Sequence, residues 1–313
     1  TASSQFYNGH QMNFGKNRVQ YGTFYWKFYR FDRYDVYSYE EGTELSLIVA
    51  DIVEKELTRI ERYFDYNFEK RLIFITYHKL SDFRQSNIGQ GLNEEETSNT
   101  GGITKIIQNK IFLYYEGDYQ KLKQQITQTI AEALIYEMLY GNDFKDNFTS
   151  STLMNIPEWY IKGLVSYVSN PWDFEIENRV KDGIISGRYE KFNRLSGVDA
   201  WYAGHSFWKY IGDMYGESVI ANILYITRIH KNTSRGFLYV LGFPMKDLSN
   251  DWLGYYINMF NDGESLGELP VEGKIIDKTK KKRVYQQIKY SPDGRYIAWI
   301  TNELGQYRIY LHD

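Results

Sequence analysis

Apolar residues recur at intervals of three and four positions along several stretches of the chain, which is the spacing of one helix face. In residues 43–64 the apolar positions are Leu45, Ile48, Val49, Ile52, Val53, Leu57 and Ile60. This pattern predicts an amphipathic helix, with Thr43 as its N-cap. A second stretch, from about Tyr119 to Tyr140, predicts a core-facing helix that stops at Gly141. Its apolar positions step by four: Leu122, Ile126, Ile130, Leu134 and Met138.

Further helical patterns follow this central helix. One begins at Pro157, because proline is favoured in the first turn of a helix. Others cover residues 201–215, 216–230 and 245–260.

Strand-type patterns are confined to the front of the chain and to its end. Residues 24–39 are aromatic and partly alternating, which predicts one or two strands. Residues 71–78 and 110–115 predict two more, and residues 89–102 between them form a polar loop. Because the front third mixes strands with helices and the rest is mostly helical, we expect an α+β fold with a small mixed sheet and a helical C-terminal lobe.

The helical pattern of apolar residues ends near residue 266. Residues 266–283 resemble a linker and end in the basic run KTKKKR. Residues 284–313 predict three short strands separated by the turn sequences SPDG and NELG. We therefore expect four parts: an extended arm (1–23), a main domain (24–265), the linker (266–283) and a short C-terminal β segment (284–313).

Composition narrows the classes of function. The 313 residues carry a net charge of −3, which gives no electrostatic reason to expect nucleic acid as a partner. No apolar run is long enough to predict a transmembrane helix. Cysteine is absent, which excludes disulfides, thiol catalysis and cysteine-ligated zinc. The 30 Tyr, 18 Phe and 7 Trp favour protein–protein contact surfaces or reflect codon bias, with about equal weight.

A helix that binds catalytic zinc needs two histidines four residues apart, as in His-Glu-x-x-His, because that spacing points both rings at one ion. The histidines here are His10, His78, His205, His230 and His312, and no two have that spacing. The sequence therefore predicts no metal and no cofactor.

The order of three segments nevertheless resembles the gluzincin-like zinc peptidases, in particular bacterial peptidase-like domains that precede a β-propeller. The segments are EALIYEMLYG, IPEWYIKGLVSYV and AGHSFWKYIGDMYGESVI, and the resemblance covers most of residues 30–260. The second segment matches a family pattern of Pro-x-Trp, two variable residues, then Glu-Gly-x-x-x-Tyr, with lysine in place of the glutamate. The tail KYSPDGRYIAWITNELGQYRIYLHD is similar to one propeller repeat of Tol-system and prolyl-oligopeptidase proteins.

When the family's zinc site is carried over to this chain by the resemblance, its positions fall on residues that do not match the family's ligands. In one register, aligned on the EMLYG end of the helix, the two histidine positions fall on Gln128 and Glu132 and the general base on Thr129. The third ligand falls on Lys162. A lysine ammonium would repel a metal cation, so we expect Lys162 to form an ion pair with Glu132 where the zinc would be.

A rival register puts the general base at Glu132 and the histidine positions at Ala131 and Ile135, with the third ligand again at Lys162. The sequence does not decide between the two registers. Equally, Gln128, Glu132 and Lys162 could be ordinary solvated residues on helix faces.

Two functions follow from the resemblance. The first is a non-catalytic pseudo-peptidase that binds or scaffolds proteins in a bacterial cell-envelope assembly, in the periplasm or at the outer membrane, its targeting segment removed. In that case the strand KIFLYY, with Phe112 and Tyr114, is the candidate edge strand for binding an extended peptide. The second is an active hydrolase with a non-standard site. His205 is followed by Ser206, but neighbours in a helix point in different directions, so we expect His205 to pack or to make a polar contact.

Overall fold

The computed structural model describes residues 21–86, 105–107, 109–141, 156–264, 283–303 and 306–312. By its contacts the chain divides into two compact units, Thr1–Asp262 and Gly263–Asp313. The expected arm and linker lie almost wholly outside the described residues.

The first unit contains a five-stranded mixed sheet in the order β1-β2-β3-β5-β4. β2, β3 and β5 run parallel, and β1 and β4 pair antiparallel at the two edges. The register aligns Val36 with Phe74 and Phe74 with Ile111. The strand bounds are β1 Trp26–Arg30, β2 Tyr34–Tyr39, β3 Leu72–Tyr77, β4 Lys105–Ile107 and β5 Lys110–Tyr114.

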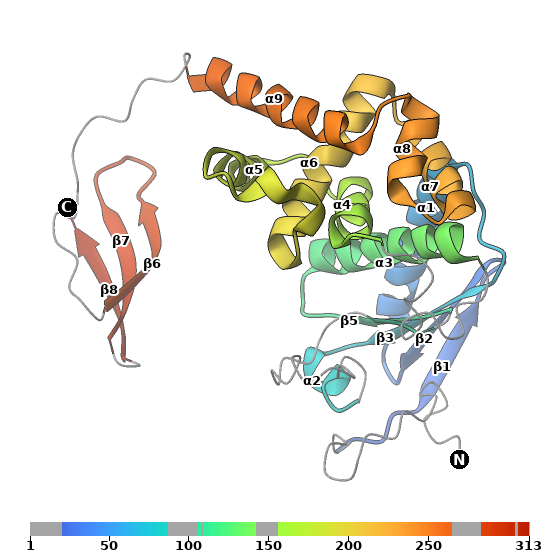
Figure 1. Ribbon diagram of the computed structural model, residues 1–313. Helices are drawn as coiled ribbons and strands as arrows, with labels where there is room; N and C mark the ends of the chain where they lie inside the picture. Colours follow the sequence, from blue (N-terminus) through green and yellow to red (C-terminus); the bar gives the residue numbers. More distant parts are fainter. Residues whose placement is uncertain are drawn as a thin grey trace, which may run out of the picture. The chain divides into compact units, whose positions relative to one another are not determined.

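The alternation of side chains along these strands makes two apolar layers. On one face Val36, Phe74 and Ile111 join the main core, which is completed by α1 (Thr43–Phe64) and α3 (Tyr119–Tyr140). On the other face a smaller aromatic cluster includes Tyr39 and Tyr77. Figure 1 shows α3 across one face of the sheet and α2 (Leu80–Phe83) on the other side. The fold is therefore α+β, as the sequence predicts.

The periodic patterns place the long helices correctly. α1 and α3 have the predicted limits, except that the N-cap of α1 is Gly42 and Thr43 is its first helical residue. Gly141 ends α3 with a φ of +76°, a conformation that glycine adopts without strain.

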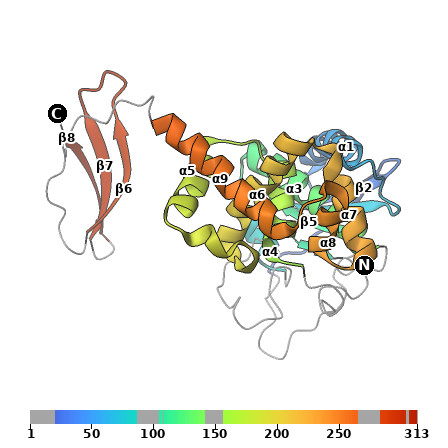
Figure 2. The same cartoon turned by 45° about the horizontal axis from the view of Figure 1, so that its top comes forward.

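The helical lobe follows α3 and packs on it. Figure 2, which views the unit more from its helical side, shows α4 and α7 close to α3, in agreement with their contacts. The sequence patterns missed α5, α8 and the 3₁₀ helix η2. The bounds are α4 Glu158–Ser169, α5 Phe174–Ile185, η2 Arg188–Arg194, α6 Gly197–Tyr215, α7 Ser218–His230, α8 Thr233–Leu241 and α9 Met245–Glu264.

The closest approach in this lobe is between α4 and α6. A Cβ on Gly163 would overlap the Cα and carbonyl carbon of Gly204, and a Cβ on Gly204 would overlap the carbonyl oxygen of Trp159. A buried hydrogen bond from Trp208 Nε1 to the carbonyl oxygen of Tyr160, 2.9 Å long, ties the same two helices together. The pair of glycines thus sets the distance between α4 and α6.

The second unit is an antiparallel meander of β6 (Arg283–Tyr290), β7 (Ile297–Glu303) and β8 (Gln306–His312). Trp299 and Tyr310, directly opposite each other on β7 and β8, stack at 5.7 Å. The turn sequence SPDG connects β6 to β7, with Gly294 at a φ of +72°. Among the described helices of the chain, none is both long and apolar enough to cross a membrane.

The glycine contact predicts a specific sensitivity. Gly204→Ala should lower the free energy of unfolding by at least about 2 kcal/mol, because the added methyl group overlaps backbone that no rotamer change can move. Gly254→Ala is the matched control: it lies within α9 and no atom stands within 4 Å of its added Cβ. That substitution should raise stability by about 0.5–1 kcal/mol through helix propensity. Urea unfolding of both variants tests the contact, and equal effects would contradict it.

Candidate functional site

The second half of α3 presents one partly exposed face, formed by Gln128, Glu132 and Tyr136 at intervals of four residues. Ala131 and Ile135, which carry the histidine positions of the rival register, are fully buried in the main core. Glu132 belongs to the site in both registers. The helix that carries these residues begins at Asp118, whose carboxylate accepts the backbone N–H groups of Gln120 and Lys121, and it ends at Gly141.

Glu132 is a carboxyl group that is mostly withdrawn from water. Burial raises its pKa above the ordinary value of 4.5, and the positive charge of Lys162 opposes part of that rise. Among the residues that the structure describes, none makes a hydrogen bond or an ion pair with it. The charge of Glu132 adds to burial in raising the pKa of Tyr136, one turn further along α3.

Lys162 does not form the expected ion pair with Glu132. Its Nζ lies 2.7 Å from Oε2 of Glu158, one turn earlier on α4, and both side chains are about half exposed. Glu158 Oε2 also accepts the backbone N–H of Gly197 at 2.9 Å. The hydrogen bond from Lys162 is the main cause of the lowered pKa of Glu158. The ammonium is thus satisfied at the water boundary, where pairing costs less desolvation than it would beside Glu132.

Thr129 and Gln128 do not complete a polar cluster. The Thr129 hydroxyl donates back to the carbonyl oxygens of Gln125 and Ile126, at 2.7 and 3.0 Å, so it is used within α3. Gln128 is half-buried, and no hydrogen bond connects its side-chain amide to another described residue. The expected cluster of Gln128, Glu132 and Lys162 is therefore reduced to a long-range attraction between two opposite charges.

The prediction that KIFLYY is an edge strand able to bind a peptide is also wrong. β5 lies between β3 and β4, so it has no free edge along the part that β4 covers. Phe112 is fully buried and Tyr114 half-buried, and both belong to the aromatic cluster on the face of the sheet opposite α3. Beyond β4, the side-chain amide of Gln125 caps the main chain of Tyr114, accepting its N–H at 3.4 Å and donating to its carbonyl at 3.1 Å.

His205 packs in the core and makes a polar contact, as expected. Its Nδ1 lies 2.6 Å from the hydroxyl oxygen of Ser166, and burial lowers its pKa to about 4. The Ser206 hydroxyl donates to the carbonyl oxygen of Ala203 and accepts Trp252 Nε1–H, so the two neighbours act separately. Over the described ranges, no group of three or more His, Asp or Glu side chains is placed to hold a metal ion.

Comparison of the chain with protein-family models gives no match, and comparison with curated proteins gives none either. The chemistry of the site therefore has to be argued from its own residues. A half-buried carboxyl group with a raised pKa, under the electrostatic influence of Lys162, can attract a cation or exchange a proton. The partner of Lys162 was readable in the sequence, since Glu at i and Lys at i+4 favour each other on a helix.

The two glutamates predict opposite pH effects. The folded-state pKa of Glu132 is raised, so ionisation of this group opposes folding as pH rises above 4.5. Glu132→Gln, which cannot ionise, should therefore stabilise the protein at neutral pH, and the gain should vanish below that value. The measurement is urea unfolding across a pH series.

Glu158→Gln is the matched control on the facing helix. The folded-state pKa of Glu158 is lowered, so its contribution is present at neutral pH and is lost on acidification. The variant should lose about 0.5 kcal/mol at neutral pH, because the pair is half exposed, and the deficit should close in acid. Parallel pH profiles for the two variants would show that the environment assigned to Glu132 is wrong.

Proposed function

We propose that this chain is an inactive member of the gluzincin-like peptidase group that acts as a protein-binding or scaffolding module in a bacterial cell-envelope assembly. The observation that carries the proposal is the side chain at the third-ligand position, Lys162. Its ammonium lies at the water boundary in a hydrogen bond with Glu158. A fixed positive charge at that position opposes binding of a divalent cation, which supports a site without metal chemistry.

Glu132 supports the same conclusion. In the rival register it is the residue that would polarise a water bound to zinc. Without a neighbouring metal ligand its burial only raises its pKa. A carboxyl group in this state can still contact a cationic or hydrogen-bonding group of a bound protein.

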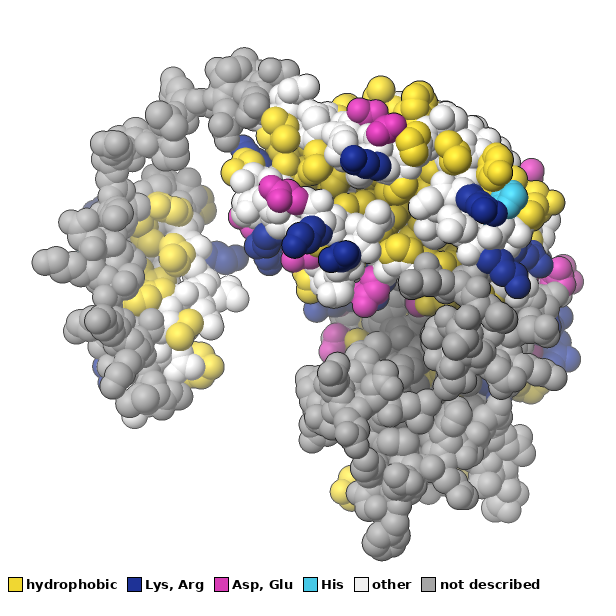
Figure 3. Space-filling view, in the orientation of Figure 1, with side chains coloured by type: hydrophobic (Ala, Val, Ile, Leu, Met, Phe, Trp, Pro, Cys, Tyr) yellow, Lys and Arg dark blue, Asp and Glu magenta, His cyan; other side chains and the backbone are white. Residues whose placement is uncertain are grey.

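Exposed apolar side chains on α7 and α8 support a binding role. Tyr225 and Ile229 lie one turn apart on α7 and are 60% and 54% exposed, and Tyr239 on α8 is 62% exposed. The Tyr239 ring stacks on His230, next to Ile229. In Figure 3 apolar side chains reach the surface at several places over the helical part of the first unit, between charged ones. Large aromatic and aliphatic residues in a polar surround are typical of protein contact surfaces.

The second unit adds to this argument. On β8 the side chains of Tyr307, Ile309 and Leu311 share one face and are each at least two-thirds exposed. A three-stranded sheet with an open apolar face is stabilised by a neighbour, as a propeller repeat is. The envelope location rests on the resemblance alone.

One observation favours the second candidate, a hydrolase with a non-standard site. A carboxyl group whose pKa is raised by burial suits a general base. Cleavage of an unfolded protein substrate in the presence of a chelator, abolished by Glu132→Gln, would favour this candidate and contradict the proposal above.

Restoring the missing ligands tests the proposal and decides the register. One variant carries Ala131→His, Ile135→His and Lys162→Glu, and the other carries Gln128→His, Thr129→Glu, Glu132→His and Lys162→Glu. We expect one of the two to hold zinc in a stoichiometric amount after dialysis, because three ligands on two packed helices recreate the site. Lys162→Glu alone is the control and should hold none. If both variants keep the circular dichroism of the parent and neither holds zinc, these positions do not descend from a zinc site.

A further inference from the structure

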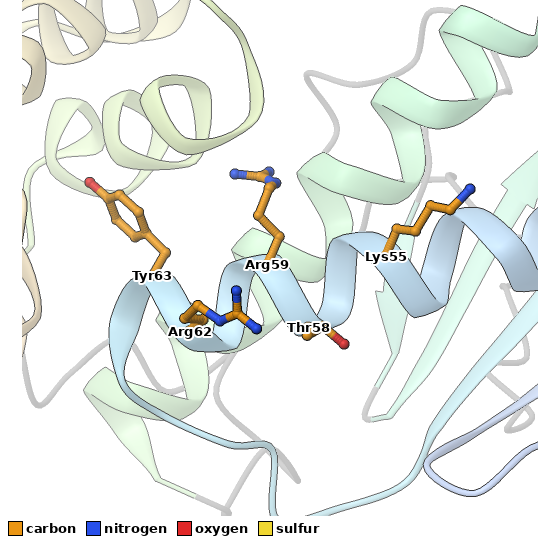
Figure 4. A pocket seen from close by; sticks show the side chains of 5 residues that line it. All are labelled: Lys55, Thr58, Arg59, Arg62 and Tyr63. Atoms are coloured by element: carbon orange, nitrogen blue, oxygen red, sulfur yellow. The ribbon is translucent and has the colours of Figure 1, made fainter.

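A cavity of about 340 Å³ lies along α1, and its lining includes none of the candidate-site residues of α3 and α4. Its lining consists of Lys55, Thr58, Arg59, Arg62 and Tyr63, all on one helix. The spacings of three and four residues place these side chains on one face, turned away from the core positions Val53, Leu57 and Ile60. In Figure 4 the side chains of Lys55, Arg59 and Tyr63 leave the same side of α1.

Every charged side chain of the lining is cationic, and each keeps hydrogen-bond donors for a ligand. Lys55 uses one of three N–H groups on Asp51, at 2.7 Å. Arg59 has five N–H donors, of which one binds Glu56 at 2.8 Å and another the carbonyl oxygen of Val168 at 3.1 Å. These two bonds fix the guanidinium between α1 and α4 before any ligand arrives.

Arg62 contributes the largest unused set of donors. It is exposed in the last turn of α1, and among the described residues no hydrogen bond or ion pair involves its guanidinium. A cation near a helix C-terminus is stabilised by the helix dipole, which alone would account for its presence. The helix dipole does not account for the cavity or for the Tyr63 hydroxyl beside it.

The Tyr63 hydroxyl is buried and finds no hydrogen-bond partner in the part of the chain that the structure describes. Burial raises the pKa of Tyr63, and the charges of the nearby Tyr167 and Glu217 add to that rise. Tyr167 donates its own proton to Glu217, 3.2 Å away. A buried hydroxyl without a partner is costly, so a ligand that accepted its proton would stabilise the protein.

The acidic groups around the cavity are already engaged. Asp51 is paired with Lys55, and Glu217 accepts from Tyr167. Glu56 is buried and shared between Arg59 and Lys123, whose Nζ lies 3.4 Å from it. The cavity therefore offers several donors and an excess of positive charge, in a chain whose net charge is −3.

We propose that this α1 cavity binds a phosphate-type oxyanion, either free or as the headgroup of a larger molecule. Arg59, Arg62 and Lys55 supply charge-assisted hydrogen bonds, and Tyr63 supplies a neutral donor that the folded chain leaves unused. This binding site is independent of the proposed pseudo-peptidase function, because none of its residues lies on α3 or α4.

The test is titration of the intact chain with inorganic phosphate, followed by calorimetry and by the unfolding temperature. The expected result is saturable binding at one site, with an unfolding temperature that rises with phosphate concentration. Vesicles that carry a phosphomonoester lipid, compared with neutral vesicles, form the second arm. Binding to the lipid vesicles as well as to inorganic phosphate would identify the headgroup as a source, and binding to inorganic phosphate alone would identify free phosphate.

Two variants locate the binding. Arg62→Gln and Tyr63→Phe should each weaken phosphate binding, the arginine change by about tenfold, since it removes a charged donor. Without phosphate, Tyr63→Phe should be at least as stable as the parent, because it removes only an unpartnered hydroxyl. Arg235→Gln, an exposed arginine on α8, is the control for the change of charge and should bind as the parent does. The absence of saturable binding in both arms, or equal binding by all three variants, would overturn the proposal.

Discussion

Gly163 on α4 and Gly204 on α6 meet backbone to backbone, in a space that has no room for a methyl group. This approach brings Trp159 and Tyr160 against Trp208 and lets the Trp208 indole donate to the Tyr160 carbonyl. The position of α4 is thereby fixed from one side by α6 and from the other by α3. Lys162 directly precedes Gly163 on α4, so the position of this helix also determines where Lys162 lies in the candidate site.

The charges of the site follow from that placement. Lys162 lies on the exposed side of α4 and is held by Glu158, whereas Glu132 lies on α3 where less water reaches it. A direct pair between Lys162 and Glu132 would require the ammonium to leave its solvated partner for a drier site, and desolvation opposes that move. The proposed loss of zinc chemistry is consistent with such an arrangement. An ammonium group at the position proposed for the third zinc ligand would repel a metal cation from the Glu132 carboxylate.

The sequence predicts local structure well and spatial assembly poorly. The limits of α1 and α3 follow from apolar spacing, because each helix buries one continuous face. The pattern misses α8 because its nine residues give too little periodicity, and it misses α5 because that helix is rich in polar residues and contains Gly183 near its end. Strand order depends on pairing between distant segments, so the sequence predicts β5 at an edge that β4 occupies. Phe112 and Tyr114, expected on a peptide-binding edge, belong to the aromatic cluster on one face of the sheet. The predicted pair of Lys162 and Glu132 is wrong for a different reason: Glu158, four residues before Lys162 on the same helix, is a nearer partner in a more solvated place.

The measurement that tests the account most directly is elemental analysis of the purified, unaltered chain after dialysis against zinc, with transition metals determined in the same sample. The account predicts no zinc above the buffer background, because the protonated Lys162 cannot bind a metal and Glu132 alone supplies too few ligands. One tightly bound zinc per chain would contradict it, and a metal-dependent hydrolase would then become the leading interpretation.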